Sequence, residues 1–437
     1  MSIEDFEIRQ KEVWREWYLA IQGFFYFAQG VAFAALLLLP VIMTTYVSNP
    51  ISFDDAITYQ FVIMIPWYIK LLYGLLSDNV SISKFGRRKP YIVIASLLGV
   101  VGWFVLPSIT KFGAGFVILG IILSLSIALS DAIIDSLAVD ITPEKRRGWM
   151  QGVGWGGRGA GTASAGILFY FILGKVPWSV AFYIAGGLII IAGFVALFYR
   201  EPSILAKEEI SRVNWNDYKV EFKKKETWIV TLFMLLSGAG IALISTFTTF
   251  MNETPSIPIN LEEIGLGITF FALGQFVGAS LMGILGDLIP FFIVLLTSTG
   301  LYIAGIVALI FIPYTNLTIL YVMIGILGAL NGGFEASQMR IGMDYSQGPI
   351  AGSLYNWYMS VSNIGQIGLG SIIITQLAIA FGETTAGWTY AMQTAGVFLL
   401  LSIIPAIFLI QWLRKRKMEP ANVLEHKVIE ENEKETV

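Results

Sequence analysis

The sequence lacks the residue types that build disulfide, thiolate and histidine chemistry. Its 437 residues include no cysteine, which excludes a disulfide framework and a thiolate metal site. The single histidine, His426, lies in a charged segment near the end of the chain. This position argues against a histidine metal cluster and against a histidine proton relay. We therefore expect no metal, no cofactor, no nucleic-acid partner and no enzyme.

Charge is also scarce. Charged residues make up 14% of the chain, whereas a soluble domain has about 25%. Hydrophobic residues make up 56%, and the mean hydropathy is +0.71. The first 17 residues are charged and polar, so we do not expect them to form a cleavable signal peptide. The composition predicts an integral membrane protein with the lipid bilayer as its solvent.

The apolar residues gather in twelve runs, each long enough for a helix that crosses a bilayer, which needs about 20 residues. The runs are 17–46, 55–77, 91–110, 114–141, 150–173, 178–200, 227–250, 263–287, 290–312, 317–344, 350–380 and 388–413. We therefore predict an all-α membrane protein with twelve transmembrane helices. Its parts are an N-terminal six-helix bundle (1–200), a linker (201–226), a C-terminal six-helix bundle (227–413) and a charged tail (414–437).

Basic residues set the expected orientation, because cytoplasmic loops are enriched in lysine and arginine. With the N-terminus inside the cell, 23 of the 28 lysines and arginines fall in cytoplasmic segments. Only Lys111 and Lys175 fall outside, and three lie within predicted spans. Both termini, the linker and the tail are therefore predicted to be cytoplasmic.

The two halves of the chain look like copies. "GLLSD" at 74–78 recurs as "GILGD" at 283–287. Acidic residues near helix ends recur in two registers: Asp78 with Asp287, Asp131 with Glu335, and Asp140 with Asp344. Six helices repeated in the same direction are an arrangement found in transporters. The repeat predicts two homologous six-helix bundles.

The stretch from 74 to 89 carries a specific resemblance. "GLLSD" followed by "FGRRK" at 85–89 resembles the signature loop between the second and third helices of the major facilitator superfamily. That resemblance implies rocker-switch alternating access and a conformational latch at the cytoplasmic side. It assigns the latch to Asp78, Arg87 and Arg88. Gly74 is expected to let the second helix approach the eleventh.

Shorter segments resemble different branches of that superfamily. "PWYIKLLYGLLSD" at 66–78 resembles folate–biopterin transporters. Lys70 together with "SDAIIDSLAVDITPEKRRG" at 130–148 is similar to muropeptide permeases and acetyl-CoA transporters, whereas "FGRRKPYIV" resembles glycoside/cation symporters. The first group carries organic anions and amphiphiles and the last carries sugars, so these resemblances imply a carrier of a small organic solute. We expect an organic anion rather than a neutral sugar. We also expect a monomer in the plasma membrane, with H⁺ and Na⁺ as the candidate coupling ions.

Two other functions stay open. A cation-coupled sugar symporter is the alternative within the same class. A sensor or assembly factor that no longer transports is the alternative from another class. The intact latch argues against the second, because a chain that does not alternate between two states has little need of one.

Charged residues within the predicted spans are the candidates for coupling and substrate binding, because such charges are costly in a bilayer and usually paired or functional. The candidates among them are Lys70, Asp131, Asp135, Arg158 and Glu335. Asp131 and Asp135 are four residues apart and share a helix face, where two carboxylates repel if both ionise. One interpretation is a structural network of Lys70, Asp135 and Arg158. The other is proton uptake by an acid and binding of an anion by a base.

Polar stripes on apolar helices indicate a water-filled path or contacts between helices. The expected cavity-lining residues are Gln22, Tyr26, Gln29, Asn331, Gln338, Asn356 and Asn363. Near the end of the run 317–344, Arg340 and Asp344 are expected to form a simple pair within one helix. The glycine-rich stretch "GVGWGG" at 152–157 follows no strand, so it predicts close helix packing rather than a nucleotide site.

Overall fold

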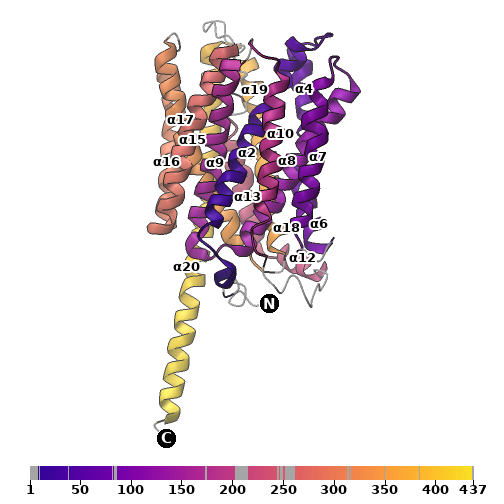
Figure 1. The fold of residues 1–437 in the computed structure, drawn as a ribbon. Coiled ribbons are helices and arrows are strands. Elements are labelled where there is room, and N and C mark those ends of the chain that lie inside the picture. The colour runs from indigo at the N-terminus through magenta and orange to yellow at the C-terminus, as the bar shows by residue number, and fades with distance from the viewer. Residues whose placement is uncertain are drawn as a thin grey trace.

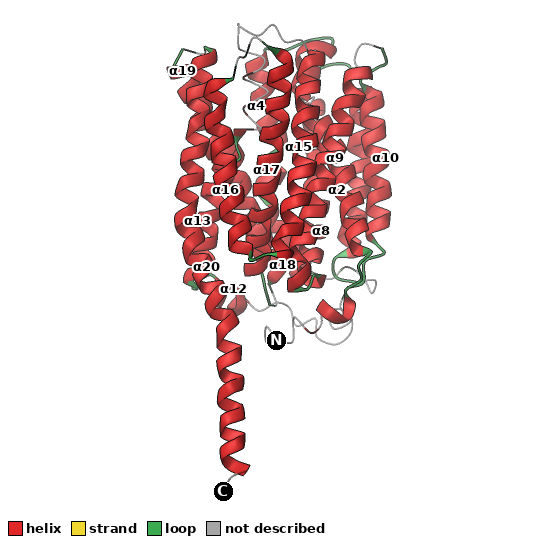
Figure 2. Ribbon diagram, turned by 90° about the vertical axis from the view of Figure 1, so that its left-hand side faces the viewer, coloured by secondary structure: helices red, strands yellow, loops and turns green. Residues whose placement is uncertain are grey.

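The computed structural model describes residues 8–435, apart from 9, 38, 81, 83–85, 173–174, 202–214, 244–245, 247–249, 251–260, 313, 315, 349 and 383. The first half of the chain contributes α2 (Tyr18–Leu37), α3 (Leu39–Val41), α4 (Phe53–Ile63), α5 (Ile65–Tyr68), α6 (Lys70–Asn79), α7 (Lys89–Val105), α8 (Ala114–Ile141), α9 (Arg147–Ile172) and α10 (Ser179–Ala196). The second half contributes α12 (Trp215–Glu221), α13 (Lys225–Gly240), α15 (Leu261–Leu288), α16 (Phe291–Ala308), α17 (Leu317–Tyr345), α18 (Ala351–Asn363), α19 (Ser371–Ala380) and α20 (Thr385–Glu435). Figure 2 shows the helices side by side in one elongated bundle.

The bundle is that of an integral, multi-pass membrane protein. Within the described residues, nine helices are long and apolar enough to cross a bilayer. The other three predicted runs also contain helices: α4 to α6 in 55–77, α9 in 150–173, and α13 in 227–250. α9 is a single 26-residue helix whose glycines, glutamine and arginines lower its hydropathy, whereas α13 is 16 residues long.

The run 55–77 differs from the single helix expected there. It divides into α4, α5 and α6, with breaks at Met64 and Ile69. Pro66 lies in the first turn of α5, and proline has no N–H to continue the hydrogen bonds of a preceding helix. The breaks bring Trp67 and Lys70 to the wall of an internal cavity.

Glycines allow the central helices to approach closely. α9 packs against both α2 and α15. A Cβ atom on Gly152 would lie 2.8 Å from the Cα atom of Gly283, and one on Gly159 would lie 2.7 Å from the backbone nitrogen of Phe276. Both distances are shorter than real contacts of a Cβ atom. This confirms that the glycine-rich stretch serves packing.

One end of the bundle carries the linker helix α12, the ends of α6 and α8, and the starts of α9 and α18; we call it the linker end (Figure 1). The first described residues lie at the same end, and α20 projects from it as a helix that continues to Glu435 (Figure 1). The segment 414–435, expected as a separate charged tail, thus continues the preceding helix.

Candidate functional site

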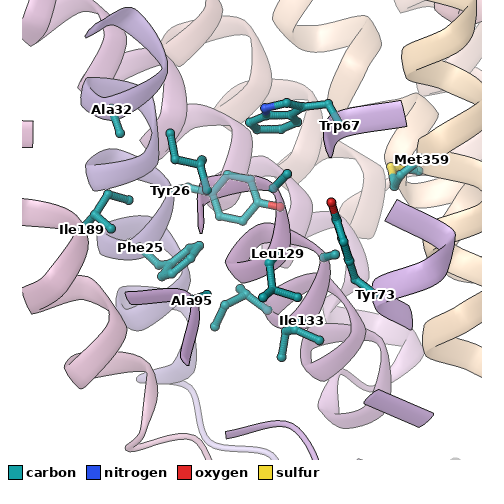
Figure 3. Packing of buried hydrophobic residues seen from close by; sticks show 14 of the residues in the cluster. Phe25, Tyr26, Ala32, Trp67, Tyr73, Ala95, Leu129, Ile133, Ile189 and Met359 are labelled. Atoms are coloured by element: carbon teal, nitrogen blue, oxygen red, sulfur yellow. The ribbon is translucent and has the colours of Figure 1, made fainter. Parts of the chain in front are cut away.

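A cavity of about 120 Å³ lies between helices of the two halves. Tyr26 and Trp67 come from α2 and α5, and Met359 faces the same region from α18 (Figure 3). The five charged side chains expected to carry function all line this cavity: Lys70, Asp131, Asp135, Arg158 and Glu335. We call these five residues the cavity cluster. The fold therefore brings together charges from α6, α8, α9 and α17.

Lys70 and Asp131 form a direct ion pair across α6 and α8. Gln29 on α2 donates a hydrogen bond to the other carboxylate oxygen of Asp131. The Lys70 ammonium also lies 4.8 Å from the ring centre of Trp67, within range of a cation–π contact. Both members of the pair are buried, so each compensates the desolvation of the other.

Asp135 lies one turn further along α8 and has a different partner. The hydroxyl of Tyr26 donates a hydrogen bond to its carboxylate. One interpretation of the sequence was a network of Lys70, Asp135 and Arg158. The structure differs from it, because the ammonium of Lys70 pairs with Asp131. Asp135 is left with a neutral hydrogen-bond donor.

Arg158 on α9 is surrounded by aromatic rings. Its guanidinium carbon lies 4.4 Å from the ring centre of Phe33, 4.9 Å from that of Trp155 and 5.6 Å from that of Trp67. Among the described residues, no carboxylate oxygen lies within 4.0 Å of its nitrogens. A guanidinium that borders a cavity without an ion pair is suited to bind an anion.

Glu335 on α17 faces the cavity from the second half of the chain. The side-chain amide of Gln275 on α15 donates a 2.6 Å hydrogen bond to its carboxylate. Asn331, one turn earlier, accepts from the same amide at 3.3 Å and donates to the hydroxyl of Tyr302 at 3.1 Å. Glu335, like Asp135, has a neutral hydrogen-bond donor as its direct partner.

The predicted polar stripes divide between cavity and packing. Tyr26 and Asn363 line the cavity. The other five residues of that prediction make buried contacts between helices: Gln22 with Tyr199, Gln29 with Asp131, Asn331 with Tyr302, Gln338 with Ser237 and Ser362, and Asn356 with Ser136. The prediction that these five residues line the cavity is therefore corrected. An amide in an apolar bundle finds a hydrogen-bond partner on the neighbouring helix.

Sequence reasoning missed several residues on the cavity wall. Phe33, Trp67 and Gln275 were not singled out, although all three contact the cavity cluster. Pro66 was a usable signal for Trp67, because a proline inside an apolar run marks a break where the following side chains change direction. Phe33 and Gln275 lie in apolar helices with no such mark.

At the linker end, four charged residues form what we call the linker-end cluster: Asp78, Arg87, Arg88 and Asp140. Arg88 lies 2.9 Å from Asp78 and 2.7 Å from Asp140, while Arg87 reaches the same carboxylates at 3.4 and 3.2 Å. Asp78 also accepts from the backbone N–H of Ser353 at 2.8 Å, at the start of α18. The cluster thus connects the first half of the chain to the second.

Gly74 permits this connection. A Cβ atom at this position would lie 2.9 Å from the Cα atom of Ser353. α6 therefore approaches α18 at a distance that only glycine allows. Phe85, the first residue of the "FGRRK" motif, lies outside the described residues.

A second cluster at the linker end repeats this arrangement in the other direction. Asp287, at the end of α15, accepts from the backbone N–H groups of Gly148 and Trp149, at the start of α9. Arg340 lies 2.6 Å from Asp287 and 3.6 Å from Asp344. The expected pair within one helix is therefore the longer contact of Arg340, because Asp344 is held at 2.9 Å by Arg147 of the other half.

The linker helix α12 lies against the linker-end cluster. The hydroxyl of Tyr218 lies 3.0 Å from the hydroxyl of Ser353 and accepts a 3.3 Å hydrogen bond from Asn79. Burial raises the pKa of the Tyr218 phenol, so the hydroxyl stays protonated at neutral pH. The linker therefore contributes a neutral contact to the junction between α6 and α18.

Comparisons with known proteins agree with this geometry. The family model of the Major Facilitator Superfamily matches residues 19–258 and 255–431. A folate–biopterin transporter of Synechocystis sp. is 28% identical over 265 residues, which cover 57% of this chain and 51% of that protein. A probable folate–biopterin transporter 4 of Arabidopsis thaliana is 32% identical over 117 residues, covering 25% of this chain and 24% of that protein. The aligned segments thus span about half and about a quarter of these relatives.

Solved structures share the fold. The E. coli fucose:proton symporter FucP superposes with a TM-score of 0.66 at 14% identity, covering 90% of this chain and 98% of that chain. A structure of FucP in the outward conformation gives a TM-score of 0.67 at 13% identity, with the same coverage. The relatives are transporters rather than enzymes, and the resemblance expected from the sequence is confirmed. The chain belongs to the Major Facilitator Superfamily of membrane transporters.

Proposed function

We propose that this protein carries an organic anion with a planar ring system across the membrane. The observation that carries the proposal is Arg158, a cation on the cavity wall with aromatic neighbours and no carboxylate within 4.0 Å among the described residues. Three rings around one guanidinium suit a flat, negatively charged solute. The names of the two folate–biopterin relatives support pterin acids as the first candidates.

The proposed cycle is a rocker switch between two six-helix bundles, 1–200 and 227–413. In the proposed arrangement, twelve helices cross the plasma membrane. The linker 201–226 and both termini are cytoplasmic, and the carrier is a monomer. The linker-end cluster and the second cluster around Asp287 support this cycle. Each of them joins one half of the chain to the start of a helix in the other half. Opening at the linker end would require both sets of contacts to break.

A matched pair of ligands tests the proposal. Pterin-6-carboxylate and its neutral 6-hydroxymethyl analogue differ in charge and share the ring system. The carboxylate should raise the Tm of the purified protein and accumulate in proteoliposomes, whereas the neutral analogue should do neither. The Arg158→Gln variant should lose both responses to the carboxylate.

The sugar symporter is the alternative that the same experiment can favour. The amides of Gln275, Asn363 and Gln366 line the cavity and could bind hydroxyl groups. Stabilisation by a neutral sugar, unchanged by Arg158→Gln, would replace the anion proposal with this one. Binding of an anion without uptake would favour a sensor.

A further inference from the structure

The charges around the cavity do not balance if all are ionised. Lys70 and Arg158 contribute two positive charges, and Asp131, Asp135 and Glu335 contribute three negative charges. The sum is therefore one negative charge, in a space where low polarisability strengthens every interaction. An anion that entered this cavity would be repelled, so the charge state has to change when it binds.

Two of the five charges already compensate each other. Lys70 and Asp131 are in direct contact, and Gln29 satisfies the second oxygen of Asp131. This pair is neutral as a unit. The net charge of the cavity is therefore set by Arg158 and by the carboxyl groups of Asp135 and Glu335.

Asp135 is the less favourable place for a negative charge. The groups that face it are the Asp131 carboxylate on the same helix, Lys70, Arg158, and the phenols of Tyr26 and Tyr355. The carboxylate of Asp131 is only one turn away and repels a second negative charge. Lys70 is already bound to Asp131, so Asp135 is best accommodated as a protonated acid.

Glu335 has no such neighbour. The titratable groups that face it are Arg158 from α9 and Tyr302 from α16, while Gln275 from α15 donates a hydrogen bond suited to a carboxylate. No carboxylate is among these neighbours in the described part of the chain. The ionised form of Glu335 can therefore serve as the counter-charge of Arg158 when the cavity is empty.

We propose that Glu335 takes up one proton each time a monoanion binds at Arg158, so that the two move together without net charge. This inference rests on the proposed transport of an anion. In the empty cavity Glu335 balances Arg158. When the substrate anion takes that role, Glu335 becomes surplus and binds a proton, while Asp135 stays protonated throughout. The cavity carries no net charge in either state. The free-energy cost of enclosing it in a low-dielectric environment during the conformational change is therefore small.

Proton counting tests this proposal. The heat of binding of pterin-6-carboxylate, measured in buffers with different ionisation enthalpies, gives the number of protons taken up per bound anion. Comparison of variants cancels the ionisation of the ligand itself. Wild type and the control Asp135→Asn should take up one proton, and Glu335→Gln should take up none. Gln at 335 can still accept the hydrogen bond from Gln275, so the variant preserves this contact.

A second measurement needs no variant. If one proton is linked to binding, the affinity for the anion falls about tenfold for each pH unit above the range in which Glu335 of the empty protein ionises. Anion uptake into proteoliposomes should then be electrically silent. Proton uptake that persists in Glu335→Gln, an affinity that does not vary with pH, or a current that accompanies uptake by the wild type would overturn the proposal.

The two proposals fail in different ways. If pterin-6-carboxylate does not bind while a neutral solute does, the anion proposal fails and this inference falls with it. If the anion binds and is transported with no proton, the transport proposal stands and the role of Glu335 is wrong.

Discussion

The linker-end cluster and the cavity cluster are both buried, yet their charges are satisfied to different degrees. Asp78 is held by two arginines and by the backbone and side chain of Ser353. In the cavity, Asp135 has a phenol, Glu335 has an amide, and Arg158 has aromatic rings. Burial is similar in the two places, so the difference lies in the partners.

This difference gives a criterion by which we expect structural charges to differ from functional ones. A buried charge with several charged and backbone partners is compensated in one conformation, and it changes only when the helices that carry those partners move apart. A buried charge with only neutral partners can still gain a proton or a ligand. We therefore expect the linker-end cluster to hold the two halves together, and Asp135, Arg158 and Glu335 of the cavity cluster to be available to a proton or a solute.

Asp78→Asn is expected to have the largest effect on stability. Arg88 is 0% exposed, and the substitution leaves its buried guanidinium with Asp140 as its remaining ion-pair partner. Breaking a buried, fully paired charge costs about 4 kcal/mol, so the Tm of the purified protein should fall by many degrees. Glu221→Gln is the control, because its pair with the exposed Lys224 is worth less than about 1 kcal/mol. Equal losses in the two variants would contradict the distinction between the clusters.

Lys70→Gln tests the saturated part of the cavity cluster. It leaves the buried carboxylate of Asp131 with Gln29 as its remaining hydrogen-bond donor, and we expect a loss of about 3 kcal/mol. The double variant Lys70→Gln/Asp131→Asn should recover much of this loss, because no lone charge remains. Thermal unfolding of both single variants and the double variant gives the coupling energy, and additive losses would show that the pair is not a unit.

Tyr218→Phe removes a single neutral contact of the linker end. The phenol bridges Ser353 and Asn79, so its loss should cost about 1 kcal/mol. Proteolysis of the linker, followed over time, should be faster in this variant than in Phe222→Leu, which keeps both hydrogen bonds. A Tm loss as large as that of Asp78→Asn would mean that the linker, rather than the ion pairs, dominates closure.

Arg158→Gln should have the smallest effect on stability. The guanidinium has aromatic contacts and no ion pair within 4.0 Å in the described residues, so we expect a Tm change that corresponds to less than about 1 kcal/mol. Its effect on function should be large, with affinity for pterin-6-carboxylate reduced at least about tenfold, or about 1.4 kcal/mol. Arg158→Lys should restore part of this affinity. A strong loss of stability would place Arg158 with the structural charges.

Several features could be predicted from local pattern. The apolar runs indicated a helical membrane protein, and "GLLSD" with "FGRRK" indicated the superfamily. The five charges expected to carry function all line the cavity. These predictions succeeded because a charged side chain in a long apolar run is too costly to expose to lipid. It therefore faces the interior of the bundle or a cavity.

Other features could not be predicted in this way. Asp131 and Asp135 are both aspartates on one helix face, and only the packing of α6 against α8 shows that Lys70 pairs with the first. The amides on α2, α17 and α18 share one spacing, yet most of them meet neighbouring helices instead of the cavity. Spacing along a helix gives the face, but the partner on that face belongs to another helix.

The sequence by itself determined that most of the chain lies in a lipid bilayer, which superfamily it belongs to, and which charges must be buried. Those properties follow from composition and from short motifs, which act within a few turns of one helix. The tertiary structure alone decided which charges are saturated and which remain available, and it left Arg158 among aromatic rings with Glu335 facing it from the other half of the chain. The reason is that the compensation of a buried charge depends on distances of a few ångströms between helices that are far apart in sequence.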